Sequence, residues 1–100
     1  MRRLIVAAVL FAVPATTGCG SVYATVSMNA AQARLEQARA VGAEQAAPYE
    51  YTFAREHLRK AQLEAAEASY SDAAAYADTA ELYAQKAIDI VEAAKKAEAK

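Results

Sequence analysis

The sequence predicts an all-α protein: a three-helix antiparallel bundle or a helical hairpin with coiled-coil-like, alanine-rich packing, preceded by a cleaved signal peptide. Alanine, the residue with the highest helix propensity, accounts for 29 of the 100 residues. Glycine and proline, which interrupt helices, occur only three and two times. Small and apolar residues recur at alternating spacings of four and three, which places them along one face of each helix.

The first 18 residues have the order of a secretory signal peptide. Arg2 and Arg3 form a basic start, residues 4–13 form an apolar run without charge, and Pro14 and small residues follow. A run of ten residues is too short to cross a bilayer core of about 30 Å, which requires roughly 20 helical residues. We therefore expect residues 1–18 to be removed rather than retained as a membrane anchor.

Cys19 is the only cysteine, so it cannot form a disulfide within the chain, and a single sulfur makes a poor metal site. Residues 16–19, Thr-Thr-Gly-Cys, resemble the lipobox of bacterial lipoproteins, although Thr16 stands where that motif usually has an aliphatic residue. The resemblance implies cleavage before Cys19, acylation with chains such as palmitate, and a lipidated tether over residues 19–22. Gly20, in place of the Asp that retains lipoproteins at the inner membrane, implies the periplasmic face of the outer membrane.

Ordinary cleavage is the alternative. Val13-Pro14-Ala15 has the small-x-small pattern of a standard signal-peptidase site. Cleavage near Ala15 would release a soluble periplasmic module that begins at Thr16. Its helices would then serve as a binding or chaperone-like surface with no membrane anchor.

Residues 23–100 are predicted to form the alanine-rich helical domain, and its first helix covers about 23–46. Ser21 is the candidate N-cap, because a serine hydroxyl accepts hydrogen bonds from the first free amides of a helix. Gly42 weakens the end of this helix. The residues on its apolar face are Ala24, Met28, Ala31, Leu35, Ala38 and Gly42.

Two further helices are predicted, at about 48–68 and 72–98. Pro48 gives the firmest boundary, because proline cannot continue a preceding helix but suits the first turn of the next. Ser69 and Ser71 are candidate N-caps of the last helix. The apolar faces are Tyr51, Ala54, Leu58, Ala61, Ala65 and Ala68 on the second helix, and Ala73, Ala77, Ala80, Ala84, Ala87, Val91 and Ala94 on the third, which Tyr76, Tyr83 and Ile90 widen.

Charge and composition argue against several functions. From Cys19 onward, nine Lys and Arg stand against twelve Asp and Glu, a net charge of −3 without a basic patch, so we expect no nucleic-acid partner. His57, the only histidine, has Phe53 and Ala61 at its helical neighbour positions, which predicts a solvated histidine and no metal site. No nucleophile, base and orienting group are recognisable together, so we predict no catalytic residue, no cofactor and no enzymatic activity.

The predicted core is small, because most residues on the apolar faces are alanine. A chain of this length usually reaches only about 3–5 kcal/mol of net stability from such a core. We therefore expect self-association, or an envelope protein partner, to cover apolar surface left on the long third helix.

The stretch 47–77 resembles a family of short, alanine-rich envelope proteins known only as a domain of unknown function. The shared pattern is Ala-Pro before one helix, a Leu-x-x-Ala step inside it at 58–61, and a Tyr-x-x-Ala step opening the next at 70–73. The resemblance covers residues 25–98 and implies a bacterial lipoprotein. Some members are joined to an OmpA-type peptidoglycan-binding domain, and these 100 residues contain no such segment.

A further resemblance is to the small alanine-rich lipoproteins that tie the outer membrane to the cell wall. Those proteins carry an acylated cysteine at one end and a peptidoglycan-linked lysine at the other. Lys100 would be the attached residue here, while Pro48 argues against a single continuous helical rod. The leading expectation is thus a lipid-anchored structural or adaptor protein of the bacterial cell envelope that acts through helix–helix contacts.

Overall fold

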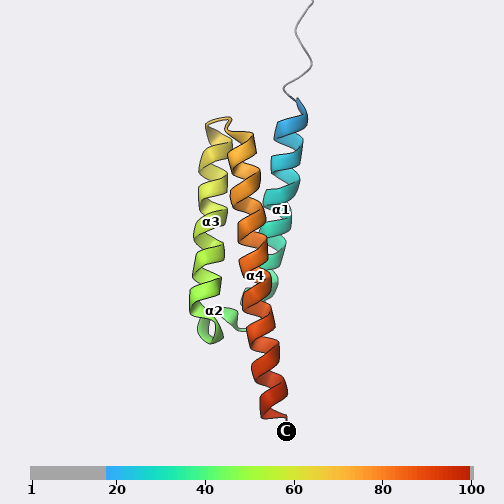
Figure 1. The fold of residues 1–100 in the computed structure, drawn as a ribbon, viewed down its shortest axis with the longest axis vertical. Coiled ribbons are helices and arrows are strands. Elements are labelled where there is room, and N and C mark those ends of the chain that lie inside the picture. The colour runs from blue at the N-terminus through green and yellow to red at the C-terminus, as the bar shows by residue number, and fades with distance from the viewer. Residues whose placement is uncertain (1–17, 100) are drawn as a thin grey trace, which may run out of the picture.

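The computed structural model describes residues 18–99, and all of the regular structure within them is helical. Three long helices lie side by side as a bundle, and a fourth, of one turn, lies in the connection between the first two (Figure 1). The elements are α1 (Gly18–Ala40), α2 (Ala43–Ala46), α3 (Pro48–Ala66) and α4 (Tyr70–Glu98). The predicted all-α fold is therefore confirmed. The predicted signal peptide lies outside the described residues, apart from Gly18.

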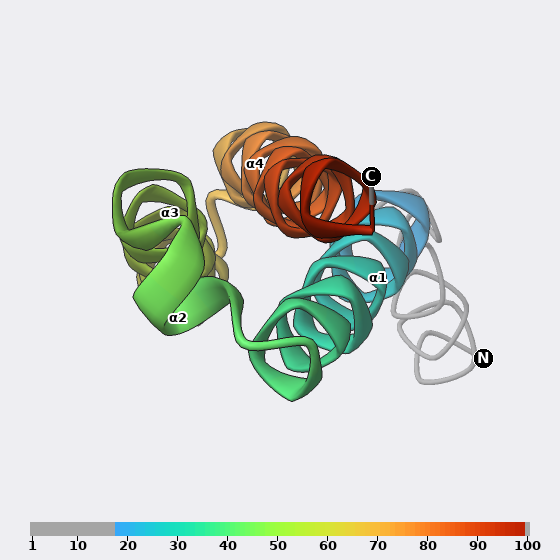
Figure 2. The same cartoon turned by 90° about the horizontal axis from the view of Figure 1, so that it is seen from below.

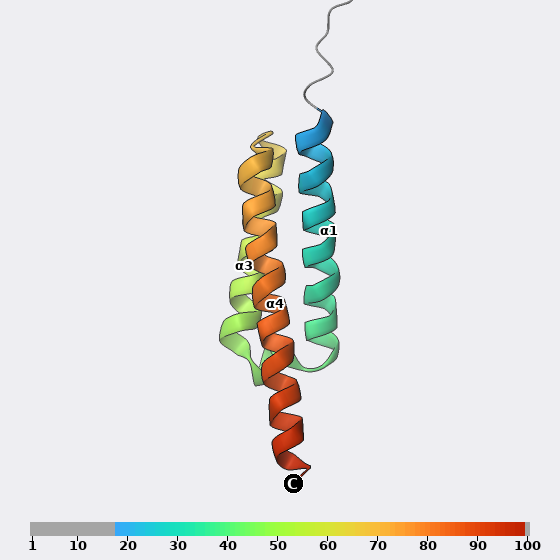
Figure 3. The ribbon, with the colours of Figure 1, turned by 45° about the vertical axis from the view of Figure 1, so that its right-hand side comes forward.

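α4 is the central helix of the bundle. It packs along both α1 and α3, which contact each other much less (Figure 2). α1 and α4 run in the same direction and α3 runs opposite to both, so the chain passes down, up and down (Figure 1). α4 continues past the α1–α3 connection, and its last turns project alone (Figure 3). Among residues 18–99, no helix is both long and apolar enough to cross a membrane.

The core is built mainly from alanine. On α1 and α3, buried alanines alternate with larger side chains, whereas α4 buries only alanine until Ile88 and Val91. The small side chains let helix axes approach to the close end of the 8–10 Å range. The predicted apolar faces are confirmed along most of their length, but Ala68, Ile90 and Ala94 are exposed. The buried alanines are Ala24, Ala31, Ala38, Ala43, Ala47, Ala54, Ala61, Ala73, Ala74, Ala77, Ala80, Ala84 and Ala87.

The start of the first helix differs from its predicted position. α1 already begins at Gly18, so residues 19–22, expected as a tether, are helical. Ser21 therefore lies inside the helix and is not its N-cap. Its carbonyl oxygen accepts a hydrogen bond from the hydroxyl of Thr25, at 2.8 Å. Packing against α4 accounts for the early start, because Ala24 is fully buried and a Cβ at Gly20 would lie 3.7 Å from the Cβ of Tyr70.

The predicted end of the first helix was also wrong, because the range 23–46 contains two helices rather than one. Gly42 has φ 86°, a left-handed conformation that a right-handed helix cannot continue. Its amide donates to the carbonyl of Arg39 at 3.0 Å, which closes the end of α1. The short α2 follows, with Ala47 leading into Pro48 at the first position of α3.

The turn between α3 and α4 confirms the predicted break near Ser69. The amide of Ser69 donates to the carbonyl of Glu64 at 2.8 Å, and that of Ala68 to Ala65 at 3.0 Å, which is a Schellman motif. Ala68 occupies its left-handed position with φ 62°, where glycine is usual. Ser69 stands at the N-cap without a side-chain hydrogen bond to the helix, and α4 begins at Tyr70, two residues earlier than predicted.

Candidate functional site

Aromatic side chains gather along the contact between α3 and α4. Tyr49, Phe53 and His57 are four residues apart on α3, so they lie one above another on one face. Tyr76 and Tyr83 are seven residues apart on α4 and meet them across the contact. These five side chains form a continuous series of rings, which we call the aromatic row.

Phe53 is the centre of the aromatic row. Its ring centroid lies 4.0 Å from that of His57, stacked at 20°, and 4.1 Å from that of Tyr83, tilted at 32°. The ring of Tyr49 lies 5.9 Å from Phe53, and the ring of Tyr76 lies 6.1 Å from His57. Aromatic pairs at such distances contribute about 0.5–1.5 kcal/mol beyond their buried area. The row therefore adds ring contacts to the alanine packing that joins α3 to α4.

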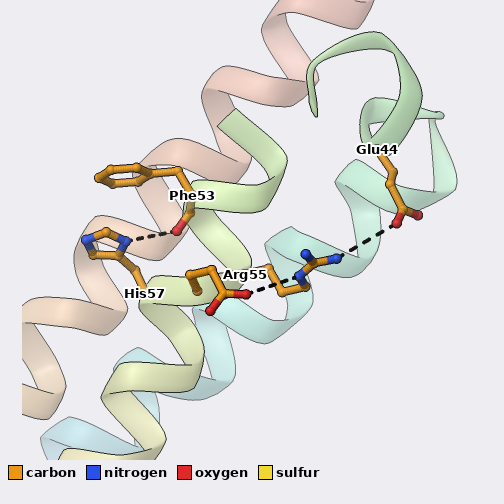
Figure 4. A network of polar contacts seen from close by, with 5 residues as sticks. Glu44, Phe53, Arg55 and His57 are labelled. Atoms are coloured by element: carbon orange, nitrogen blue, oxygen red, sulfur yellow. Dashed lines mark hydrogen bonds and ion pairs between the residues drawn. The ribbon is translucent and has the colours of Figure 1, made fainter. Parts of the chain in front are cut away.

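His57 is half-buried within this row, so the prediction of a solvated histidine was wrong. Its Nδ1 lies 2.9 Å from the carbonyl oxygen of Phe53, and because a carbonyl only accepts, Nδ1–H is the donor (Figure 4). One ring face stacks on Phe53. The spacing of four from Tyr49 through Phe53 to His57 is the sequence signal that could have indicated this arrangement.

Two lysines cover tyrosine rings of the aromatic row. The Nζ atoms of Lys60 and Lys86 lie 4.5 Å from the ring centroids of Tyr76 and Tyr83, respectively, which is cation–π geometry. Hydrogen bonding to the Tyr76 side chain, followed by its charge, raises the pKa of Lys60 above the usual 10.5. The ammonium group of Lys60 is solvent-exposed, so this contact does more to orient the lysine than to stabilise the fold.

An open apolar hollow of about 480 Å³ lies at the start of α3, next to the aromatic row. Glu56 is its only charged lining residue, so the hollow suits an apolar side chain of a partner better than an ion. Tyr49 forms part of its wall and is 65% exposed. The lining residues are Pro48, Tyr49, Thr52, Phe53, Glu56 and His57.

A second hollow, of about 350 Å³, lies in the wide gap between α1 and α3. Three buried side chains line it, together with three arginines and polar residues. The buried lining residues are Leu35, Tyr51 and Leu58, and the arginines are Arg39, Arg55 and Arg59.

One of the three arginines at this hollow forms ion pairs with nearby glutamates. Arg55 lies 3.9 Å from a carboxylate oxygen of Glu44 on α2 and 3.7 Å from one of Glu56 on its own helix (Figure 4). All three side chains are about half exposed, and surface pairs of this kind contribute about 0–1 kcal/mol. The pair with Glu44 connects α2 to α3 rather than forming a binding site.

The two residues predicted as modification sites lie near opposite ends of the described chain. Cys19 is in the first turn of α1. Lys100 is outside the described residues, directly after the projecting end of α4. The bundle separates the start of α1 from that end (Figure 1). Lipidation of Cys19 and peptidoglycan attachment at Lys100 stay predictions.

Metal-ligand side chains do not cluster in the part of the chain that the structure describes. No group of three or more His, Cys, Asp or Glu side chains there could hold a metal ion. His57 in particular directs Nδ1 to a backbone carbonyl and stacks one ring face on Phe53. Among the described residues, the side chains that converge are those of the aromatic row.

Fold and site together define a class of protein: an alanine-packed three-helix bundle with an aromatic row across one pair of helices. The family model described as Domain of unknown function (DUF4398) matches residues 26–100. The chain belongs to this family, and the resemblance predicted for residues 25–98 is confirmed to that extent. No significant match was found among curated proteins or among solved structures.

Proposed function

We propose that this protein is a lipid-anchored structural or adaptor protein of the bacterial cell envelope, acting through helix–helix contacts. The observation that carries the proposal is the position of Cys19, in the first turn of a bundle helix and directly after a segment with the order of a signal peptide. Acyl chains on Cys19 would hold the bundle at the membrane without a flexible spacer. Each buried methylene contributes about 0.8 kcal/mol, so several chains give stable anchoring.

The helix surface available for contacts supports an adaptor role. Leu82 and Ile90 on α4 are 54% and 39% exposed, and residues 92–99 of the projecting end are all exposed. An anchor on α1 would leave this end directed away from the membrane, toward a second copy or an envelope partner. Gly20 favours the periplasmic face of the outer membrane as the location. The proposed role includes no catalytic step, cofactor or nucleic acid.

Labelling cells with radioactive palmitate tests the proposal. We expect the wild-type protein to take up label and to fractionate with membranes, and Cys19→Ser to do neither. Thr16→Leu, which supplies the usual aliphatic residue of the lipobox, is the matched control and keeps the label. If wild type and Cys19→Ser both appear in the soluble periplasm, the protein is the unanchored module released by cleavage near Ala15.

The intact mass of the membrane-extracted protein tests the cleavage site and both modifications. A chain beginning at Cys19 with acyl chains supports the proposal, whereas one beginning at Thr16 contradicts it. If the mass includes a peptidoglycan fragment that is absent from Lys100→Arg, the protein is also attached to the cell wall through Lys100. An unmodified Lys100 would leave the lipid as the only anchor.

A further inference from the structure

The first turns of α1 expose an apolar patch. Val22, Tyr23 and Val26 are 63%, 59% and 60% exposed, although the opposite face of the same helix is buried at Ala24. The spacings of three and four place Tyr23 and Val22 beside Val26 on one face. We call these three residues the N-terminal patch.

The surroundings of the patch on α1 carry no charge. Between Arg3 and Arg34 the sequence contains no Asp, Glu, Lys or Arg, so α1 is uncharged from Gly18 to Ala33. The patch is at the end of the bundle where α1 begins, beside the α3–α4 turn (Figures 1 and 3). That turn and the start of α4 carry the acidic side chains of Glu67 and Asp72.

We infer that the N-terminal patch rests on the lipid bilayer, in the headgroup layer of a neutral membrane surface. The inference rests on the proposed function for its position, because acylated Cys19 lies on the same helix. At 1.5 Å per residue, Val22 and Val26 are about 4.5 Å and 10.5 Å along the axis from Cys19. The headgroup region of one leaflet is about 5–8 Å thick, so the patch overlaps it even when α1 stands upright. Tyr23 has the apolar ring and polar tip that favour this layer.

The contact is apolar rather than electrostatic. Glu67 and Asp72 at the same end of the bundle would be repelled by anionic headgroups. Binding through the patch therefore requires no anionic lipid and persists at high salt. A second copy of the chain fits the patch poorly, because a stable protein interface buries about 1,200–2,000 Å² and three side chains supply only a small part of that area.

Fluorescence provides a direct test, because the chain has no tryptophan and one cysteine. Tyr23→Trp places a single reporter in the patch, and Tyr49→Trp places a matched control, 65% exposed, at the opposite end of the bundle. A chain beginning at Cys19 contains all the described helices except for Gly18. Its thiol is coupled to a maleimide lipid in phosphatidylcholine vesicles, so the attachment does not depend on acylation in cells.

We expect the tryptophan emission of the Tyr23→Trp variant to shift to the blue on vesicles and to be quenched when the lipid is brominated. The emission of the Tyr49→Trp variant should change little. Equal, weak quenching in the two variants would overturn the inference. A blue shift in Tyr23→Trp that grows with protein concentration without vesicles would also overturn it, since the occupant would be a second copy. The chemical tether separates this inference from the proposed function. If bromolipid quenches Tyr23→Trp but the protein takes up no palmitate in cells, the patch contacts the bilayer and the proposed lipid anchor is wrong.

Vesicle binding without a tether gives an independent measurement. In the Cys19→Ser chain, Val22→Ser, Tyr23→Ser and Val26→Ser together are expected to weaken partitioning to phosphatidylcholine by about tenfold, because the apolar contact is removed. Leu82→Ser, which changes an exposed leucine elsewhere on the bundle, leaves partitioning unchanged. Equal partitioning of the triple variant and its parent, with both folded by circular dichroism, would contradict the inference.

Discussion

α4 makes two kinds of contact, and they differ in how much room they leave. Its buried face is a seam of alanines, from Ala73 to Ala87, that holds the helices close together. Its tyrosines join the aromatic row, where rings of α3 and α4 meet in a half-buried, partly open arrangement. The alanine seam gains stability from closeness and has no space for larger groups. The aromatic row gains stability from the contact area of its rings and borders open hollows. A ring of the row can therefore be replaced without changing the distance between the helices.

The largest effect is expected from enlarging the seam. Ala84 is 0% exposed, and Ala84→Leu adds three heavy atoms within the buried seam. We expect a loss of about 3 kcal/mol, at the upper end of the cost of overpacking. Urea unfolding followed by circular dichroism measures it, and Ala75→Leu on the exposed face of α4 is the control. A stability within error of wild type would show that the seam is loosely packed.

Truncating the centre of the aromatic row is expected to have a smaller effect. Phe53→Ala removes the ring contacts with both His57 and Tyr83 but leaves the alanine seam intact. We expect a loss of about 1–2 kcal/mol in the free energy of unfolding, below the usual 3–5 for a fully buried phenylalanine, because Phe53 is only half-buried. Tyr49→Ala, at the exposed end of the row, should cost less. If Tyr49→Ala lowers the free energy of unfolding in urea as much as Phe53→Ala does, Phe53 is not the residue on which the ring contacts depend.

A substitution in the turn between α3 and α4 is expected to raise the free energy of unfolding. Ala68 adopts φ 62°, a conformation that costs a non-glycine residue about 1–2 kcal/mol. Ala68→Gly removes that strain but frees the unfolded chain, so we expect a net gain of about 0.5–1 kcal/mol in the free energy of unfolding. Gly42→Ala, at φ 86°, is the reciprocal variant and should lose a similar amount. Equal stability of Ala68→Gly and wild type in thermal unfolding would contradict the strain.

The smallest effect concerns Lys60. Because the Tyr76 side chain raises its pKa, Tyr76→Phe is expected to lower that pKa toward 10.5, as followed by NMR titration of the lysine side chain. Because the pKa of Lys60 is higher in the folded chain than in the unfolded chain, the contact stabilises the fold fully below pH 10.5. This contribution is lost as the pH rises through the pKa of Lys60 in the folded chain. An unchanged pKa in Tyr76→Phe would assign the shift to another group, such as Glu64.

Periodicity predicted most of the fold, because the buried residues of all three long helices repeat every seven positions. The break at Pro48 and the turn before Tyr70 also followed from residue types. The early start of α1 was not predicted, since Gly18 and Gly20 are poor helix formers and tertiary packing decides whether residues 18–22 are helical. The aromatic row was missed because it depends on which faces of α3 and α4 meet, and the seven-residue spacing of the tyrosines alone could not fix that.

The repetition of alanine on α4 has a consequence for alignment. Moving α4 by one heptad would replace Ala73 with Ala80 and Ala77 with Ala84, so these alanines of the seam do not distinguish the two registers. The apolar end of the buried face does, because Lys95 would take the place of Ile88 and Glu98 that of Val91, which are both buried. The short Schellman turn opposes the same slip. The cost of burying two charges therefore selects the register together with the loop, so a longer loop alone would not release it.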